Sequence, residues 1–164
     1  MQLQPNVDER GWFVRLFDAA LFREAGLVAE FPQQSVATNT KAGTIRGMHW
    51  QNAPAAETKV LRCTRGRIFD VLVDVRRGSP TYGDWQAFEL SEARPELVYV
   101  PAGLAHGYQT LTDGCDVEYL ISAPYSADAS RGLRYDDPDL AIPWPLPVTL
   151  VSERDRAWPV LAQL

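Results

Sequence analysis

Proline and glycine recur along this chain at intervals that leave little room for long helices. The 164 residues include 12 prolines and 11 glycines. Many short strands separated by turn residues are typical of a β-sandwich or barrel. The length suits one hydrophobic core, and no repeat or linker divides it, so a single mainly β domain over residues 1–164 is expected. Strand-length segments rich in Val, Ile, Leu, Tyr and Thr lie at 44–50, 58–64, 67–75, 82–90, 96–100, 106–111 and 117–122.

Two segments depart from this strand pattern. Residues 18–25 predict a short helix, because Leu21, Phe22 and Ala25 can share a face and Gly26 is a suitable stop. The tail over residues 135–147 is rich in proline, which disfavours a helix there. We expect this tail to run extended over the surface or against the wall of the barrel.

Charge and composition exclude several classes of partner. The net charge of −5 argues against nucleic acid, whose phosphates need a basic surface. No apolar run approaches the roughly 20 residues that span a bilayer, and the N-terminus lacks the pattern of a signal peptide. Cys63 and Cys115 are too few for a disulfide framework and indicate free thiols in a reducing compartment. A cytoplasmic protein without a membrane partner is expected.

Several polar residues lie where a strand would normally face a core. Lys59 and Tyr119 each alternate with apolar neighbours, and a lysine directed at an apolar interior is costly unless it is paired or used. In a small barrel, inward-facing polar groups from several strands converge on one cavity. A strand histidine alone is more often a half-buried structural residue, and one bulge reverses a strand's faces. The candidates for a shared pocket are His49, Lys59, His106 and Tyr119.

The same residues narrow the chemistry. A typical metal site in such a barrel uses two or three imidazoles together with a carboxylate. This chain has only two histidines, which lie on separate strands and form no His-x-His pair, so no metal is expected. No nucleophile elbow, dinucleotide fingerprint or P-loop occurs, so no bound cofactor is expected either. Acid–base chemistry beside a carbonyl remains: a histidine removes a C–H proton, a lysine stabilises the enolate, and a tyrosine delivers a proton to the other face.

A set of motifs in a fixed order supports this chemistry. They are DERGWF at 8–13, GTIRGMHWQ at 43–51, KVLR at 59–62, GRIFDVLVDVRR at 66–77, GSPTY at 78–82, VPAGLAHG at 100–107, EY at 118–119, RGLRYDDP at 131–138 and SERDR at 152–156. Each motif alone is weak, but the ordered set is specific. In these motifs the chain resembles the dTDP-4-dehydrorhamnose 3,5-epimerase family of sugar-nucleotide epimerases.

The resemblance implies a fold, an activity and an assembly. The fold is a cupin-type double-stranded β-helix, a jelly-roll barrel with short helices near the N-terminus and towards the C-terminus. The activity is inversion of C3 and/or C5 of a dTDP-linked 4-keto-6-deoxyhexose, without cofactor or metal, in rhamnose or deoxysugar biosynthesis. The assembly is a homodimer in which the segment around Arg10 is exchanged between subunits.

The resemblance also implies catalytic roles for particular residues. His49 corresponds to the family's catalytic base. Asp155 corresponds to the carboxylate that orients this histidine, and without the resemblance it would pass for a solvated surface acid. Tyr119 corresponds to the proton donor. Lys59 and His106 correspond to residues that line the sugar site near the keto group.

A second group of residues is implied in binding the rest of the substrate. Arg46 corresponds to a contact to the diphosphate, Arg10 and Gln34 to residues that hold the nucleotide end, and Tyr125 to a second pocket tyrosine. The chain departs from the family pattern nearby. It has Arg15 for glutamate, Val36 for asparagine, Ser130 for glutamate and Arg154 for lysine. Arg15 and Arg154 are further candidates for substrate binding. The departures bear on which nucleotide or sugar the protein binds more than on the reaction that it catalyses.

Three alternatives stay open from sequence. One is an epimerase that inverts only C3 or only C5, since both steps can use the same histidine. Another is a non-catalytic cupin that binds sugar nucleotides, which would not need a base with its own orienting acid. The third is a metal-binding cupin.

Overall fold

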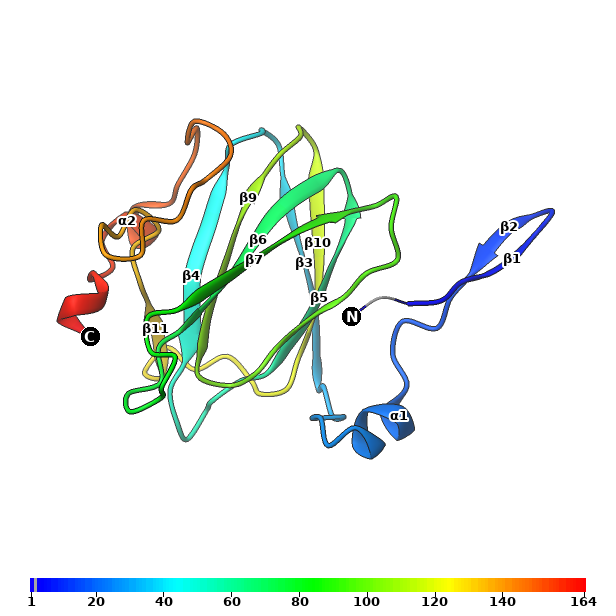
Figure 1. Cartoon of the computed structure of the whole chain (residues 1–164), viewed down its shortest axis with the longest axis horizontal. Helices are drawn as coiled ribbons and strands as arrows, with labels where there is room; N and C mark the ends of the chain where they lie inside the picture. The colour runs from blue at the N-terminus through cyan, green and yellow to red at the C-terminus, as the bar shows by residue number, and fades with distance from the viewer. Residues whose placement is uncertain (2) are drawn as a thin grey trace.

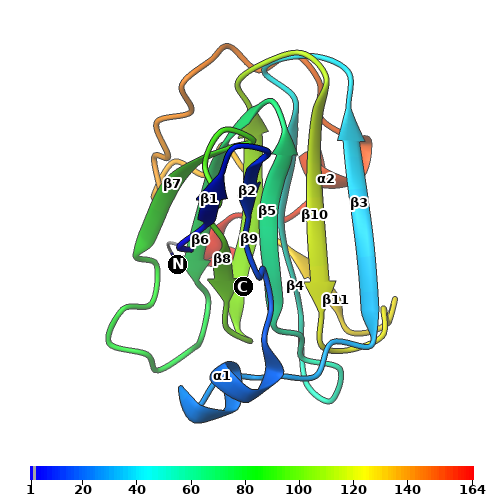
Figure 2. The same ribbon diagram turned by 90° about the vertical axis from the view of Figure 1, so that its right-hand side faces the viewer.

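Two facing antiparallel sheets form the body of the molecule in this computed structural model, which describes residues 1 and 3–164 (Figure 1, Figure 2). The first sheet has the order β3-β10-β5-β8 and the second the order β11-β4-β9-β6-β7. The mainly β jelly roll expected above is confirmed. The strands of the first sheet are β3 (Gln33–Asn39), β10 (Cys115–Ile121), β5 (Lys59–Arg65) and β8 (Val98–Val100), and those of the second are β11 (Ser130–Gly132), β4 (Ile45–Gln51), β9 (Leu104–Thr110), β6 (Arg67–Asp74) and β7 (Trp85–Ser91).

The N-terminal segment forms a hairpin and a helix outside the two sheets. Strands β1 (Asn6–Asp8) and β2 (Gly11–Phe13) pair only with each other, and the hairpin projects away from the barrel (Figure 1). Helix α1 (Ala19–Glu24) begins at Asp18, whose carboxylate accepts from the backbone N–H of Ala20 at 2.9 Å. The helix expected at 18–25 is therefore confirmed. Sequence patterns did not predict β1, β2, β3 or β11.

Two short helices lie near the C-terminus. Helix α2 (Glu153–Arg156) is capped by Ser152, whose hydroxyl accepts from the N–H of Asp155, and a 3₁₀ helix, η1, covers Leu161–Gln163. The helix expected towards the C-terminus is thus present as α2. None of the helices in residues 1 and 3–164 is long and apolar enough to cross a membrane.

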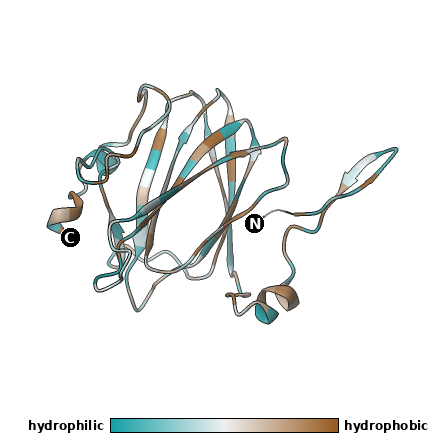
Figure 3. Cartoon of the chain, in the orientation of Figure 1, coloured by the Kyte–Doolittle hydropathy of each residue, from teal (hydrophilic) through white to brown (hydrophobic). Residues whose placement is uncertain are grey.

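The barrel sheets bury side chains on both faces, and hydrophobic and hydrophilic residues are mixed along the strands (Figure 3). Between the sheets, Leu61 and Val117 of the first sheet pack with Ile68 and Tyr108 of the second. Outside the second sheet, a separate cluster packs under the C-terminal tail. Such two-sided burial removes the simple rule that an apolar face must point into the barrel.

The strand β6 illustrates this consequence. Val71 and Val73 share one face of β6, and that face packs outside the barrel against Leu140 and Ile142 of the tail. Asp70, on the other face, points into the barrel and is completely buried. The expectation that the proline-rich tail lies against the barrel wall is confirmed.

Candidate active site

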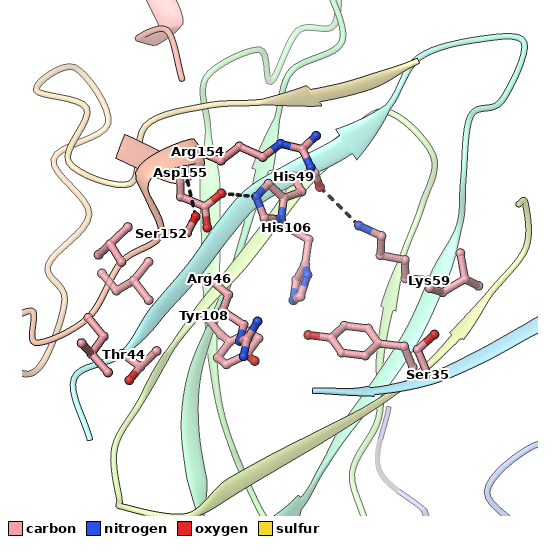
Figure 4. A pocket seen from close by; sticks show the side chains of 15 residues that line it. Ser35, Thr44, Arg46, His49, Lys59, His106, Tyr108, Ser152, Arg154 and Asp155 are labelled. Atoms are coloured by element: carbon pink, nitrogen blue, oxygen red, sulfur yellow. Dashed lines mark hydrogen bonds and ion pairs between the residues drawn. The ribbon is translucent and has the colours of Figure 1, made fainter. Parts of the chain in front are cut away.

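An open cavity of about 660 Å³ lies between the two sheets (Figure 4). Both sheets and the segment that leads into α2 contribute to its walls. His49, Lys59, His106 and Tyr119, the candidates for a shared pocket, all line it. The full set of lining residues is Ser35, Thr44, Ile45, Arg46, His49, Lys59, His106, Tyr108, Tyr119, Ile121, Leu150, Val151, Ser152, Arg154 and Asp155.

An irregularity in β4 brings Arg46 and His49 into the same cavity. Strict alternation would direct side chains three residues apart to opposite faces of a sheet. The pairing of β4 with β9 shifts register between these two residues, as at a bulge. Gly47 lies there with φ +120° and so close to Gly107 that an added Cβ would come 2.5 Å from the Gly107 Cα. Both positions therefore require glycine, and the shift places the side chains of Arg46 and His49 in one cavity.

His49 is paired with Asp155 across the end of the barrel. Its Nε2 lies 2.6 Å from Asp155 Oδ1. Burial opposes ionisation of Asp155, but the hydrogen bond and charge of His49, with donors from Gly47 and Trp158, outweigh it and lower the carboxyl pKa. Because an ionised carboxylate only accepts, Nε2 carries the ring proton in the neutral imidazole. The lone pair of His49 Nδ1 is then available to act as a base.

A second histidine–carboxylate pair lies deeper in the barrel. His106 Nε2 is 2.7 Å from Asp70 Oδ1, and both side chains are almost fully buried. This contact fixes the orientation of the His106 ring at the cavity wall. Sequence reasoning did not select Asp70, which lies on the face of β6 opposite Val71 and Val73. The sequence did not reveal that the face of β6 with Val71 and Val73 packs outside the barrel, which leaves Asp70 pointing inward.

The opposite wall carries a lysine and a tyrosine from the first sheet. Lys59 Nζ lies 2.9 Å from Glu57 Oε1 and donates to the His49 carbonyl oxygen at 3.4 Å. The Tyr119 ring centroid is 6.0 Å from that of His106. Burial, with the nearby Tyr108 and Asp70, raises the Tyr119 pKa well above its usual value, so its phenol stays protonated. Glu57 was not selected from sequence, and its only signal was its position two residues before Lys59.

Two arginines lie at the mouth of the cavity. Arg46 Nε donates to Asn39 Oδ1 at 2.7 Å, which holds the guanidinium in place. Arg154 Nη2 donates to Ser130 Oγ at 2.8 Å, and its guanidinium lies over the Trp158 ring at 5.1 Å. Ser130 and Arg154 are two of the departures from the family pattern. A direct hydrogen bond therefore joins these two departures in this chain.

The arrangement of a paired histidine facing a protonated tyrosine and a lysine suits proton transfer at a carbon beside a carbonyl. A family model described as dTDP-4-dehydrorhamnose 3,5-epimerase matches residues 1–163. This chain belongs to the dTDP-4-dehydrorhamnose 3,5-epimerase family. It is accordingly an epimerase, an enzyme of the isomerase class.

Three relatives show the range of this likeness. The dTDP-4-dehydrorhamnose 3,5-epimerase of Sinorhizobium fredii is 45% identical over 158 residues, which cover 96% of this chain and 81% of the relative. The Bacillus anthracis epimerase, solved with TDP and PPi bound, superposes with a TM-score of 0.93 at 37% identity, covering 97% of this chain and 91% of its own. A 3′-monoepimerase from Streptomyces bikiniensis, solved with dTDP-quinovose, gives 0.92 at 36% identity, covering 99% and 82%.

Not every candidate of this epimerase reaches the cavity within one chain. Arg10 is 85% exposed in the projecting hairpin, where it pairs with Asp8 at 2.6 Å. Arg15 pairs with Asp18 at 3.1 Å on the surface beside α1. Tyr125 lies beyond β10 and is 62% exposed. None of the three lines the cavity between the sheets.

Gln34 points away from the cavity for a reason of register. It pairs with Leu120 and lies beside a separate small hollow on the outer face of the first sheet. Its neighbour Ser35 pairs with Tyr119 and lines the cavity. Successive strand residues face opposite ways, so Gln33 and Ser35 occupy the cavity face of β3 while Gln34 and Val36 face outward.

Among residues 1 and 3–164, no group of three or more His, Cys, Asp or Glu side chains is arranged to hold a metal ion. Each histidine of the site has a single carboxylate partner, Asp155 or Asp70. Each carboxylate contact fixes the orientation and the tautomer of its imidazole ring.

Proposed function

We propose that this epimerase inverts C3 and C5 of dTDP-4-dehydro-6-deoxyglucose, giving dTDP-4-dehydrorhamnose. The observation that carries the proposal is the division of acid–base groups between two walls. The His49–Asp155 pair comes from the second sheet and α2, whereas Lys59 and Tyr119 come from the first sheet. A planar enolate bound between these walls would meet a base on one face and a proton donor on the other.

The first half of each inversion removes a proton from a carbon next to the C4 keto group. The lone pair of His49 Nδ1 takes the C–H proton, and the electron pair of that bond moves into the enolate. Asp155 stabilises the imidazolium that forms, as a carboxylate does in a catalytic triad. The ammonium of Lys59 stabilises the negative charge that develops on the keto oxygen, and His106 lines the sugar site beside it.

The second half returns a proton to the opposite face. The Tyr119 phenol donates it, a new C–H bond forms, and the enolate collapses to the ketone with the centre inverted. Solvent then takes the proton from His49 and reprotonates the phenolate of Tyr119. Nothing is oxidised or reduced, so the reaction balances without a cofactor.

The cavity mouth is the proposed site of the nucleotide diphosphate. Arg46, which is held by Asn39, would contact the diphosphate. Arg154 would bind the substrate at the same rim of the cavity. Gln34, Arg15 and Tyr125 remain predictions as substrate contacts, because within one chain they lie outside the cavity.

We further propose a homodimer in which the β1–β2 hairpin is exchanged. Every residue of both strands is exposed, including Val7, Trp12 and Phe13 at 76%, 55% and 67%. Apolar side chains grouped on a projecting hairpin favour burial against another surface. In this arrangement Arg10 would reach the nucleotide end of a second copy. The buried, unpaired thiols of Cys63 and Cys115 support the proposed location in the cytoplasm.

Proton NMR of dTDP-4-dehydro-6-deoxyglucose with the enzyme in heavy water tests the function. Deuterium at both C3 and C5, with formation of the rhamno product, is the expected result. Deuterium at one carbon alone would favour an epimerase that inverts a single centre. The likeness to the 3′-monoepimerase is the reason to test for that activity. Absence of exchange at both carbons would contradict catalysis and favour a binding protein.

A further inference from the structure

Trp158 lies behind the His49–Asp155 pair, outside the residues that line the cavity. Its indole Nε1 donates to Asp155 Oδ1 at 3.3 Å, the same oxygen that His49 Nε2 contacts. The indole also packs edge-on against the imidazole, with centroids 6.4 Å apart. One side chain therefore contacts both members of the pair.

The neighbouring strand leaves space for this indole. Gly132 of β11 pairs in register with His49 of β4. A Cβ added to Gly132 would overlap the indole atoms Cε2, Cδ2 and Nε1 of Trp158. The backbone at Gly132 is not in the left-handed region, so its conformation does not itself require glycine. The position of the indole accounts for the missing side chain.

A further contact orients the indole from the cavity rim. The Arg154 guanidinium lies over the ring at 5.1 Å and is itself held by the Ser130 hydroxyl (Figure 4 labels Arg154, Asp155 and His49). Ser130 and Gly132 belong to the same strand, β11. Strand β11 therefore positions the indole in two ways. Gly132 leaves space for the ring, and Ser130 holds the Arg154 guanidinium that lies over it.

We propose that Trp158, seated on Gly132, is a positioning residue that holds the Asp155 carboxylate and the His49 ring in catalytic alignment. It does not touch the substrate cavity, so it acts through the pair. With the Trp158 donor in place, Asp155 Oδ1 is shared by two N–H groups and Oδ2 accepts from the backbone of Gly47 at 3.3 Å. Three contacts leave this carboxylate little freedom to rotate. The inference rests on the proposed role of His49 as the base.

The test compares Trp158→Phe with Trp85→Phe. Phenylalanine keeps an aromatic ring but removes the N–H donor. Trp85 is the matched control, because its Nε1 donates to the Leu140 carbonyl oxygen at 2.9 Å, away from the cavity. Two readouts are taken: steady-state kcat and KM, and the ring ¹⁵N signals of the two histidines, which report tautomer and hydrogen bonding.

Trp158→Phe should lower kcat about fivefold, the effect of losing one hydrogen bond, with KM nearly unchanged. The ring signals of His49 should move while those of His106 stay in place. Trp85→Phe should change neither readout. Wild-type kcat and His49 signals in Trp158→Phe would overturn the proposal, as would equal movement of His49 and His106 signals. Movement of the His49 signals at unchanged kcat would support the positioning but contradict His49 as the base.

Gly132→Ala provides an independent steric test. In the wild-type background the added methyl group should displace the indole, lower kcat and move the His49 signals. In a Trp158→Ala background, where the indole is absent, the same methyl group should have little further effect. Equal effects of Gly132→Ala in both backgrounds would contradict the coupling between these two residues.

Discussion

His49 Nε2 and Asp155 Oδ1 lie 2.6 Å apart although 106 residues separate them in the chain. The contact depends on α2, whose Ser152 cap positions Asp155 at the end of the barrel. It sets the tautomer of His49 and leaves the Nδ1 lone pair free to accept a proton. The acid–base chemistry that we propose for the site therefore depends on a segment that belongs to neither sheet.

Replacing His49 by alanine should abolish deuterium exchange at every carbon of the keto-sugar, because His49 is the proposed base and the other imidazole of that wall, His106, is almost fully buried in its pair with Asp70. Asp155→Asn should lower the exchange rate about a hundredfold or more, since an amide cannot stabilise the imidazolium. Exchange in heavy water measures both effects. Circular dichroism serves as the folding control, and wild-type exchange in folded His49→Ala would exclude this residue as the base.

Lys59→Ala should slow exchange and inversion to the same extent, because both pass through the enolate that the ammonium stabilises. The change also leaves the Glu57 carboxylate, 2.9 Å away in the native structure, without its partner. Glu57→Gln/Lys59→Ala removes that charge and controls for its effect. If either variant lost inversion while keeping wild-type exchange, Lys59 would not act on the shared enolate.

Sequence reasoning identified much of the fold and the cavity for definable reasons. Alternation and turn residues predicted most barrel strands and helix α1. Parity on β5 and β10 directed Lys59 and Tyr119 to one interior. Asp155 could not be chosen by pattern, because its role follows from a tertiary contact, and the resemblance alone pointed to it.

Other features escaped the sequence because they depend on packing. Asp70 was missed because the valine face of β6 packs outside the barrel, under the tail. Arg46 and His49 share a cavity only through the register shift at Gly47. Gln34 illustrates the reverse case, in which a displacement of one residue along a strand changes the face that a side chain occupies.

Asp74 is predicted to stabilise the fold in a pH-dependent way. It is buried and accepts from Arg76, Ser79 and Thr81, and the Arg76 hydrogen bond contributes most to lowering its pKa. A lowered folded-state pKa gives stabilisation that is present above the unfolded pKa, roughly 3.9, and is lost as pH falls. Asp74→Asn should cost about 2 kcal/mol of unfolding free energy at neutral pH.

Urea unfolding between neutral and acidic pH checks this effect. The difference between wild type and Asp74→Asn should shrink as the pH falls below the unfolded pKa. Asp136→Asn is the matched control, because its pair with Arg134 at 2.7 Å is well exposed and should contribute less than about 1 kcal/mol. A constant difference across the pH range would contradict the linkage.

The exchanged hairpin predicts a dimer in solution. Light scattering at micromolar concentration should give twice the chain mass of 18.3 kDa. Trp12→Ser/Phe13→Ser should weaken the dimer, since both side chains are exposed in the single chain. Arg10→Ala should raise KM while leaving the mass of the assembly unchanged. A monomeric wild-type protein would exclude the exchange.

The division of labour between His49 and Tyr119 is the central claim, and Tyr119→Phe in heavy water tests it most directly. His49 should still remove protons and return deuterium to the original face, so exchange should continue. Inversion should fall by about a hundredfold or more, because the opposite wall has lost its donor. Product inversion at the wild-type rate in Tyr119→Phe would contradict the account and assign the donation to another group.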